Sequence, residues 1–244
     1  MNNRLLIILG ICVVVVVGIA IAVSSGILNV PGITKEDNKI DVGLFDYSKM
    51  ITANNLPADF DGDPDTVIDH VYGDTESSVV LIEWMNFQCS ACYSLSPSMR
   101  EIESNYGDRV AFVQRYLHLS QGHANGMAAS VAAEAAGRQG MYHDMGNLLF
   151  INQPEWGAAD TASREGVFAK YAQSLGLDMD KWHEDYQNYD KNGIKTRLDF
   201  QSQLGIKNGV SGSPFILING EKVTTTKDKI IEALDKALLN ASFN

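Results

Sequence analysis

Cysteine is scarce in this sequence, with only three among 244 residues. Cys12 lies in an apolar segment far from the others, so Cys89 and Cys92 are the only candidates for a disulfide within the folded part. A zinc site would need further ligands, but there is no second Cys-x-x-Cys motif. The five histidines also form no ligand-spaced cluster with the pair. We therefore expect no metal site.

Clusters of basic residues are also absent. The chain has 19 Lys and Arg against 30 Asp and Glu, which gives a net charge of −11. Nucleic acid is therefore not expected as a partner, because binding it requires a basic patch. Aspartates alternate over residues 59–65, as in a calcium loop, but the position 11 residues after Asp59 is His70 and not glutamate. This segment is better interpreted as a solvated acidic loop.

One long run without charged residues occurs, near the N-terminus. Residues 5–23 are 19 uncharged residues, dominated by Leu, Ile and Val. As a helix rising about 1.5 Å per residue, they would span roughly 30 Å of hydrocarbon core. Arg4 precedes the run and no Lys or Arg follows before Lys35. We therefore expect a single-pass cell-membrane anchor over residues 1–26, with the N-terminus cytoplasmic and the rest extracytoplasmic.

A cleaved signal peptide is the alternative interpretation of this segment. Residues 22–24 (Ala-Val-Ser) could serve as a cleavage site, although the apolar run is longer than a usual signal core. In either case the remainder of the chain is exported to a compartment where a disulfide can persist.

The stretch after the anchor divides into a linker and a folded domain. Residues 27–71 contain three prolines, several Gly and Asn, and little periodicity, which predicts an extracytoplasmic linker leading into the domain. We place the domain at residues 72–244. Residues at about 120–205 are predominantly helical in pattern, and the last of these helices is expected to end at Gly205.

The cysteine pair lies between a strand pattern and a helix pattern. Residues 78–85 are a nearly continuous apolar run, typical of a strand covered on both faces. If a helix begins at Cys89, its unpaired N–H groups favour a thiolate there. Cys92 lies one turn further in, so we expect Cys89 to be the exposed thiol. One reactive and one resolving sulfur are the minimum for thiol–disulfide exchange, but the motif alone equally allows a structural disulfide.

Glu83 is the one charge inside the apolar run, six residues before Cys89. It could occupy an edge position that reaches water. It could instead be buried beneath the cysteines, where desolvation would raise its pKa and let it accept the proton of Cys92. The strand pattern favours neither.

Further strands are predicted on both sides of the helical stretch. Residues 109–117 read as a strand after the first helix, and a strand–helix–strand unit of this length implies parallel pairing. Residues 215–218 are apolar and lead into Asn219-Gly220, a strong hairpin signal, so residues 221–225 should return antiparallel. Residues 227–240 form an amphipathic closing helix.

Together these motifs resemble the DsbA-like thiol–disulfide oxidoreductases of the thioredoxin superfamily, over roughly residues 72–241. The resemblance rests on Glu83, residues 87–92 (Phe-Gln-Cys-Ser-Ala-Cys), Pro97, the helical stretch, and residues 212–214 (Gly-Ser-Pro) before a strand. It implies an α/β thioredoxin fold, in which a mixed central sheet is flanked by helices and carries an inserted helical subdomain. The N-terminal transmembrane helix is additional to that fold.

The resemblance also implies roles for individual residues. It makes Cys89 the nucleophile, Cys92 the resolving cysteine and Glu83 the acid that assists proton transfer. It implies a cis Ser213–Pro214 bond, which would place Ser213 backbone groups against the cysteines for docking an extended substrate chain. No cofactor is implied beyond the redox-active disulfide. The implied partners are exported proteins with reduced cysteines and a membrane protein that reoxidises the pair.

One departure from the family concerns the residues between the cysteines. The best-known members carry a histidine there, and this chain has Ser90 and Ala91. An imidazolium would stabilise the Cys89 thiolate and make the disulfide more oxidising, so its absence leaves the direction of electron flow open. Export favours an oxidase that introduces disulfides, because exported substrates arrive reduced. A reductase or isomerase, or an anchored binding module with a structural disulfide, are the alternatives.

Overall fold

The computed structural model describes residues 40–118 and 123–243. The membrane segment predicted over residues 1–26 and the first part of the predicted linker lie outside the described residues. Within the described ranges, no helix has the length and apolar character needed to cross a bilayer.

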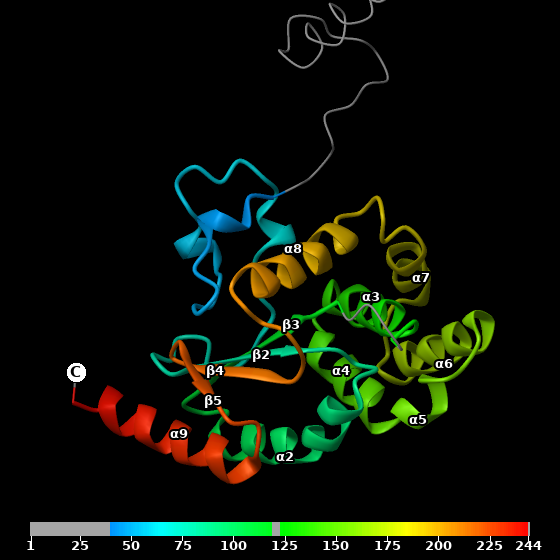
Figure 1. The fold of residues 1–244 in the computed structure, drawn as a ribbon. Helices are drawn as coiled ribbons and strands as arrows, with labels where there is room; N and C mark the ends of the chain where they lie inside the picture. The colour runs from blue at the N-terminus through cyan, green and yellow to red at the C-terminus, as the bar shows by residue number, and fades with distance from the viewer. Residues whose placement is uncertain (1–39, 119–122, 244) are drawn as a thin grey trace, which may run out of the picture. The chain divides into compact units, whose positions relative to one another are not determined.

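A mixed sheet of five strands organises the described part of the chain, in the order β1-β3-β2-β4-β5 (Figure 1). The strands are β1 (Val71–Gly73), β2 (Val80–Met85), β3 (Ala111–Tyr116), β4 (Phe215–Ile218) and β5 (Glu221–Val223). Strands β2 and β3 pair in parallel, as the strand–helix–strand pattern predicts, and the other pairs are antiparallel. The predicted β4–β5 hairpin is confirmed, with positive φ angles of 46° at Asn219 and 83° at Gly220.

The helices follow the predicted order. They are α2 (Ser90–Tyr106), α3 (Gly126–Gly137), α4 (Tyr142–Ile151), α5 (Gln153–Trp156), α6 (Thr161–Ser174), α7 (Met179–Gln187), α8 (Ile194–Lys207) and α9 (Lys227–Ala241). Short 3-10 turns precede the sheet: η1 (Val42–Leu44), η2 (Ala53–Asn55) and η3 (Pro64–Thr66).

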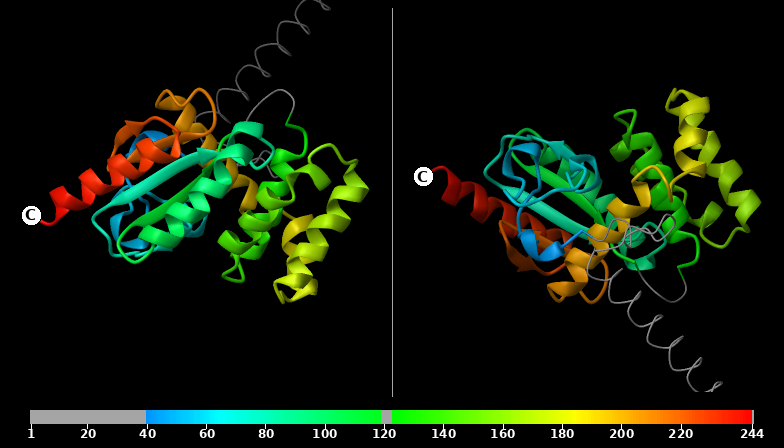
Figure 2. Two further views of the ribbon diagram at one scale, coloured as in Figure 1. Left: turned by 90° about the horizontal axis from the view of Figure 1, so that it is seen from below. Right: turned by 90° about the horizontal axis from the view of Figure 1, so that it is seen from above.

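Strand β2 is apolar except for Glu83, because both of its faces are covered. Leu81 packs with α2 and α9, while Ile82 and Trp84 pack with α8 and the segment before the sheet. Figure 2 shows the same layers, with α2 and α9 along one face and α8 with the N-terminal segment along the other. Side chains alternate along a strand, so Glu83 projects to the α2 side. The edge position considered for Glu83 is therefore wrong.

Residues 40–70 pack against the sheet, although their pattern suggested a linker. Four apolar side chains of this segment are buried, namely Val42, Phe45, Ile51 and Val67. Arg115 of β3 forms an ion pair of 2.7 Å with Asp69, and both side chains are fully buried. Its guanidinium also donates to the carbonyl groups of Tyr47 and Lys49. Buried residues on successive short turns have no helical or strand period, so periodicity could not reveal this packing.

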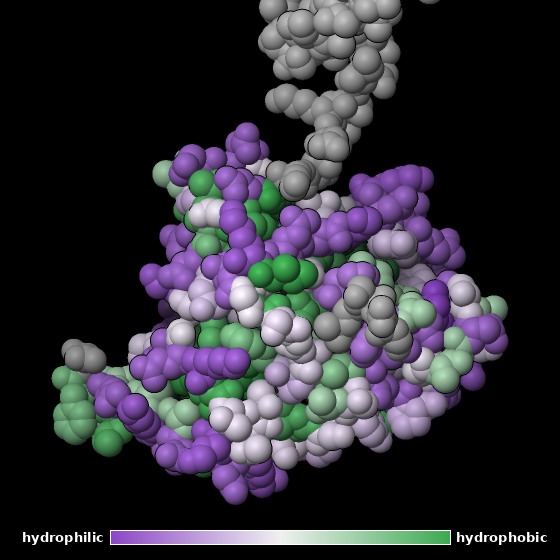
Figure 3. Space-filling model, viewed as in Figure 1, coloured by the Kyte–Doolittle hydropathy of each residue, from purple (hydrophilic) through white to green (hydrophobic). Residues whose placement is uncertain are grey.

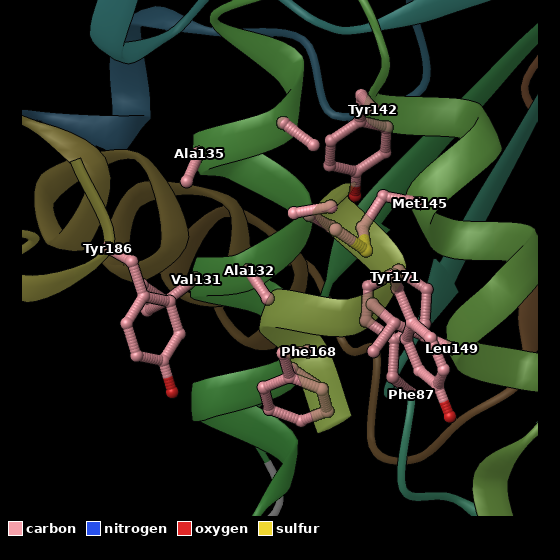
Figure 4. Close-up of a cluster of buried hydrophobic side chains, with 14 of the residues drawn as sticks. Phe87, Val131, Ala132, Ala135, Tyr142, Met145, Leu149, Phe168, Tyr171 and Tyr186 are labelled. Carbon is pink, nitrogen blue, oxygen red and sulfur yellow. The ribbon is translucent and has the colours of Figure 1, made fainter. Parts of the chain in front are cut away.

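The helical insertion has an apolar core of its own (Figure 4). Small residues on α3, such as Ala132 and Ala135, let α4 and α7 approach closely, and Phe168 from α6 fills the space between them. Phe87, from the loop that follows β2, enters the same cluster and is fully buried. The loop that carries the cysteines is thus anchored in the insertion.

Helix α8 continues past Gly205, where it was predicted to end. It ends at Lys207, and positive φ occurs later, at Gly209 (86°). Gly205 instead lies against Trp84. A Cβ at this position would come within 2.6 Å of the indole Nε1, so a larger residue would force the ring or the helix to move. The glycine serves close packing of α8 on β2.

Hydrophilic residues cover most of the face seen in Figure 3. Apolar residues show mainly between α8 and strands β4 and β5, and at the C-terminal end of α9. The large apolar side chains that are exposed among the described residues are Tyr72, Ile151, Ile206, Leu239 and Phe243.

Candidate active site

The two cysteines lie where β2 passes into α2. The Cys89 N–H donates to the Asn86 carbonyl at 2.9 Å, which turns the chain after the strand. Cys89 has extended backbone angles and caps α2, which begins at Ser90. The sulfur therefore lies at the open end of the helix, and Cys92 lies in the first turn. Both are free thiols.

Cys89 is less exposed than its position at a helix end suggested. It is 6% exposed and Cys92 is 1% exposed. The cover comes from the segment before β4, because the Cys89 Sγ lies 3.4 Å from the Ser213 carbonyl oxygen. Cys89 is more exposed than Cys92, as predicted, but the prediction that Cys89 is an exposed thiol is wrong.

The electrostatic surroundings of the two thiols differ. A hydrogen bond from Cys92 is the largest of the influences that lower the pKa of Cys89 to about 5. Burial is the next largest influence and opposes this lowering, while Ser213 and the backbone N–H groups of Cys92 and Ala91 each lower the pKa by less. Hydrogen bonding to Cys89, burial and the nearby Glu83 together hold the pKa of Cys92 far above its usual value. One sulfur is a thiolate at neutral pH and the other is a thiol.

Glu83 lies beneath this pair as a buried acid. Desolvation raises its pKa to about 8, and the charges of Glu103 and Cys89 add to that rise. Of the two placements that the sequence allowed, the structure has the buried one. A carboxyl with this pKa gains or loses a proton readily near neutral pH.

Ser213 and Pro214 come from a distant part of the chain, just before β4. Their peptide bond is cis, as the resemblance implies. The Ser213 Oγ is buried without a hydrogen-bond partner among the described residues, and the Ser213 side chain lowers the pKa of Cys89. The five residues that the sequence singled out therefore converge on one site.

Two side-chain amides, Gln153 of α5 and Gln88 of the cysteine loop, tie this loop to the helical insertion, and sequence reasoning gave neither a role. The Gln153 Nε2 donates to the carbonyl groups of Phe87 and Cys89, at 2.6 and 3.2 Å. The Gln88 side chain bridges the Gly157 carbonyl and the Asn125 N–H, at 2.5 and 2.7 Å. A single glutamine has no distinctive spacing, so no signal in the sequence could have identified the role of Gln153.

Pro97 lies inside α2 and removes one backbone donor. The carbonyl it leaves without an N–H belongs to Tyr93, four residues earlier. The Ser96 hydroxyl donates to that carbonyl at 2.9 Å, so α2 continues to Tyr106. This continuation carries Glu103 into the buried layer next to Glu83.

Glu103 was also missed, although a signal existed. With Met99 and Tyr106 it lies at the helical spacing of the inward face of α2, and all three are buried. A charged residue at such a position indicates a functional group or a buried pair. Among the described residues, no group of His, Cys, Asp and Glu has an arrangement that could hold a metal ion.

Comparisons with known proteins identify the family of this chain. The family model described as Thioredoxin matches residues 65–238. A Na(+)/H(+) antiporter NhaA 3 of Salinispora tropica is 34% identical over 179 residues, which make up 73% of this chain. The chain spans about a quarter of the length of the antiporters that it matches, 25% in this case.

Solved structures of two thiol–disulfide proteins have a similar fold. Oxidised BdbD from Bacillus subtilis aligns with a TM-score of 0.59 and 22% identity, over 70% of this chain and 92% of that one. MdbA, a thiol-disulfide oxidoreductase from Corynebacterium diphtheriae, aligns with a TM-score of 0.57 and 21% identity, over 70% and 90%. The chain therefore belongs to the thioredoxin family and has the fold of the DsbA-like thiol–disulfide oxidoreductases.

Proposed function

We propose that this chain is a membrane-anchored, extracytoplasmic thiol–disulfide oxidoreductase that introduces disulfide bonds into exported proteins through Cys89 and Cys92. The observation that carries the proposal is the difference between the two sulfurs. Cys89, whose pKa is about 5, is stabilised as a thiolate, and Cys92 is held as a thiol. A disulfide that only braces the fold has no need of this difference, and a loop this short gains little from cross-linking.

The reaction begins with the oxidised Cys89–Cys92 pair. A substrate thiolate attacks the Cys89 sulfur, the bond between the cysteines breaks, and a mixed disulfide forms. A second substrate thiolate then attacks the substrate sulfur of that bond. The substrate leaves with its new disulfide and the two electrons remain on the cysteine pair. No cofactor takes part beyond this pair.

The pKa values of these groups indicate which of them gives and which takes a proton in each step. Cys92 leaves as a thiolate in the first step and takes the proton of Glu83, which is protonated at neutral pH because its pKa is raised to about 8. Cys89 leaves in the second step as a stable thiolate and needs no proton. During reoxidation Cys92 gives up its proton again, and the Glu83 carboxylate beneath the pair accepts it.

The direction of electron flow follows from the stability of the reduced state. Stabilising the Cys89 thiolate favours the reduced protein and makes the disulfide a stronger oxidant. Here the hydrogen bond from Cys92, the Ser213 group and the N–H groups at the start of α2 supply what a histidine between the cysteines would supply. This supports an oxidase despite the Ser90-Ala91 pair.

The partners follow from the same proposal. Substrates are exported proteins with reduced cysteines, and an extended segment of them would dock beside Ser213 and Pro214. A membrane protein reoxidises the pair after each cycle. The anchor over residues 1–26 keeps the domain at the outer surface of the cell membrane, near that protein.

A redox titration in glutathione buffers tests the direction of electron flow. We expect a reduction potential less negative than about −200 mV, together with rapid oxidation of a dithiol peptide. A potential near about −270 mV would indicate a reductase instead. A disulfide that resists glutathione, in a protein silent toward both insulin and the peptide, would support a structural bond in a binding module.

Variants of the two cysteines test their roles. Mixed with the disulfide form of the peptide, Cys92→Ser should accumulate a mixed disulfide between Cys89 and the peptide, because the Cys89 thiolate attacks the peptide disulfide and the resolving sulfur is missing. Cys89→Ser should form none. Equal trapping by both variants, measured by mass spectrometry, would contradict the assignment of Cys89 as the nucleophile.

A further inference from the structure

A second buried carboxyl lies on the same side of the sheet as Glu83. Glu103 of α2 is 4% exposed and Glu83 is 3% exposed. The two are close enough for the charge of Glu103 to raise the pKa of Glu83. Burial also raises the pKa of Glu103, to about 7. Burying two acids together is unfavourable, and an apolar residue would fill the same position in α2 at lower cost.

His143 of α4 lies on the outer side of Glu103. Its Nε2 is 3.4 Å from the Glu103 Oε2, and its side chain is 20% exposed where that of Glu103 is 5% exposed. The imidazole is held in place by Tyr72 of β1, whose ring stacks on it at 3.8 Å between centroids. Burial lowers the pKa of His143 below its ordinary value, and the nearby charge of Asp144 opposes that lowering.

A cavity of about 310 Å³ joins these groups to the outside. Glu103 and His143 line it together with Gln114 of β3. Gln114 pairs in register with Glu83 on the parallel strands, so the two side chains project to the same side of the sheet. Glu83, Glu103 and His143 therefore form a series that runs from beneath Cys92 to the cavity.

Several other titratable or charged groups lie around Glu83, Glu103 and His143. They are Arg100 of α2, Asp144 of α4, Tyr72 of β1, Tyr142 of α4, and His70, which is paired with Glu134 of α3 at 2.8 Å. Arg100 favours the charged form of Glu103, and Asp144 favours the charged form of His143.

We propose that Glu103 and His143 carry protons between Glu83 and the solvent in this cavity during each exchange cycle. This proposal rests on the thiol–disulfide exchange proposed above. When Cys92 leaves as a thiolate it takes the Glu83 proton, and Glu83 takes the proton of Glu103. Glu103 then takes a proton from the His143 imidazolium, which solvent restores. Reoxidation reverses the same four transfers, and no electrons move along the series.

Stopped-flow reduction of the full-length oxidised protein by dithiothreitol tests the relay. The variants Glu103→Gln and His143→Gln keep a polar side chain, but their carboxamide groups cannot take up and release a proton as an acid or an imidazole does. We expect each to slow reduction roughly ten-fold, below the full contribution of a general acid, and to flatten the pH profile of the rate. The pKa of Cys89, read from its alkylation, should remain close to that of the wild type.

Chemical rescue separates proton transfer from a structural role. His143→Ala opens space at the cavity, so added imidazole should restore its reduction rate in proportion to concentration, with no effect on Glu103→Gln. His183→Ala, at an exposed histidine of α7, is the matched control and should behave as the wild type.

Two results would overturn the relay alone. One is a wild-type rate and pH profile in both glutamine variants. The other is a loss in His143→Ala that imidazole does not restore. A wild-type disulfide that dithiothreitol cannot reduce would instead overturn thiol–disulfide exchange, and the relay with it.

Discussion

The buried carboxyl of Glu83 links the chemistry of the site to the stability of the fold. Its pKa is about 8 in the folded protein and near 4.5 in an unfolded chain. The folded state therefore holds a proton that the unfolded state releases between these values. The stability from this proton is present below about pH 4.5 and is lost as the pH rises through 8.

Replacing Glu83 by glutamine should remove this pH dependence. We expect Glu83→Gln to be more stable than the wild type at pH 8, by an amount on the order of a few kcal/mol, and to catalyse exchange more slowly. Urea unfolding at two pH values, near 5 and near 8, measures the effect. The control is Glu76→Gln, at an exposed position, which should change neither the stability nor the rate of exchange. Equal stability of Glu83→Gln and the wild type at pH 8 would argue against a raised pKa of Glu83.

The pKa of Cys89 is lowered by two neighbouring residues of unequal weight. The hydrogen bond from Cys92 is the largest influence lowering its pKa, and Ser213 contributes less. Cys92→Ala should therefore raise the pKa of Cys89 more than Ser213→Ala does. The ultraviolet absorbance of the thiolate against pH gives both values. The reverse order would make Ser213 the main influence, and no change in either variant would show that the helix end alone stabilises the thiolate.

At the scale of elements, the segment before the sheet is held by one buried ion pair. Asp69 and Arg115 are both fully buried, and Arg115 also lies over the Trp84 ring, at 4.9 Å. Removing the carboxylate leaves a buried cation without its partner. Asp69→Asn should cost about 3–5 kcal/mol in the free energy of unfolding.

Urea denaturation measures this loss, and Asp65→Asn is its control, because Asp65 is exposed in the same segment. Limited proteolysis gives a second readout, since cleavage within residues 40–70 should increase in Asp69→Asn only. A loss in both variants of similar size would mean that general charge balance, and not the buried pair, stabilises the segment.

Elements with strong local signals could be predicted from the sequence. The apolar run of β2, the Asn219-Gly220 turn and the helical start at Cys89 each have a short-range cause, and each was found. Gly205 shows the limit of such reasoning, because a glycine near a helix end has the same sequence pattern as one that admits Trp84. Contacts between distant segments, such as Asp69 with Arg115, have no period and could not be foreseen.

At the scale of the whole molecule, the redox state and the pH act together on stability. The pKa of Cys89 is lowered to about 5 only in the reduced, folded protein. Its contribution is fully present above the pKa of an ordinary thiol, near 8.5, and is lost as the pH falls through 5. We therefore expect the reduced form to lose stability relative to the oxidised form on acidification.

Thermal unfolding of both forms from neutral pH down to about pH 4 measures this difference. The gap in melting temperature should narrow or reverse in favour of the oxidised form as the pH falls. The melting temperature of Cys89→Ala, which lacks the thiolate, should fall less on acidification than that of the reduced wild type. A gap independent of pH would mean that the thiolate is not stabilised by folding.

The site as a whole was only partly visible in the sequence. Cys89, Cys92, Glu83, Ser213 and Pro214 stood out because their types and spacings are distinctive. Residues that support them, such as Gln153, are ordinary in type and are brought to the site by the packing of the helical insertion.

The contacts between the insertion and the cysteine loop limit how the domain can be truncated or recombined. Phe87 is fully buried in the core of the insertion, and Gln153 holds two carbonyl groups of the cysteine loop. A shortened version reduced to the sheet and its covering helices would expose an aromatic ring and release the nucleophile from its alignment with Ser213. The insertion is thus not an exchangeable module, and recombining it between related proteins would require the loop at residues 86–89 to move with it.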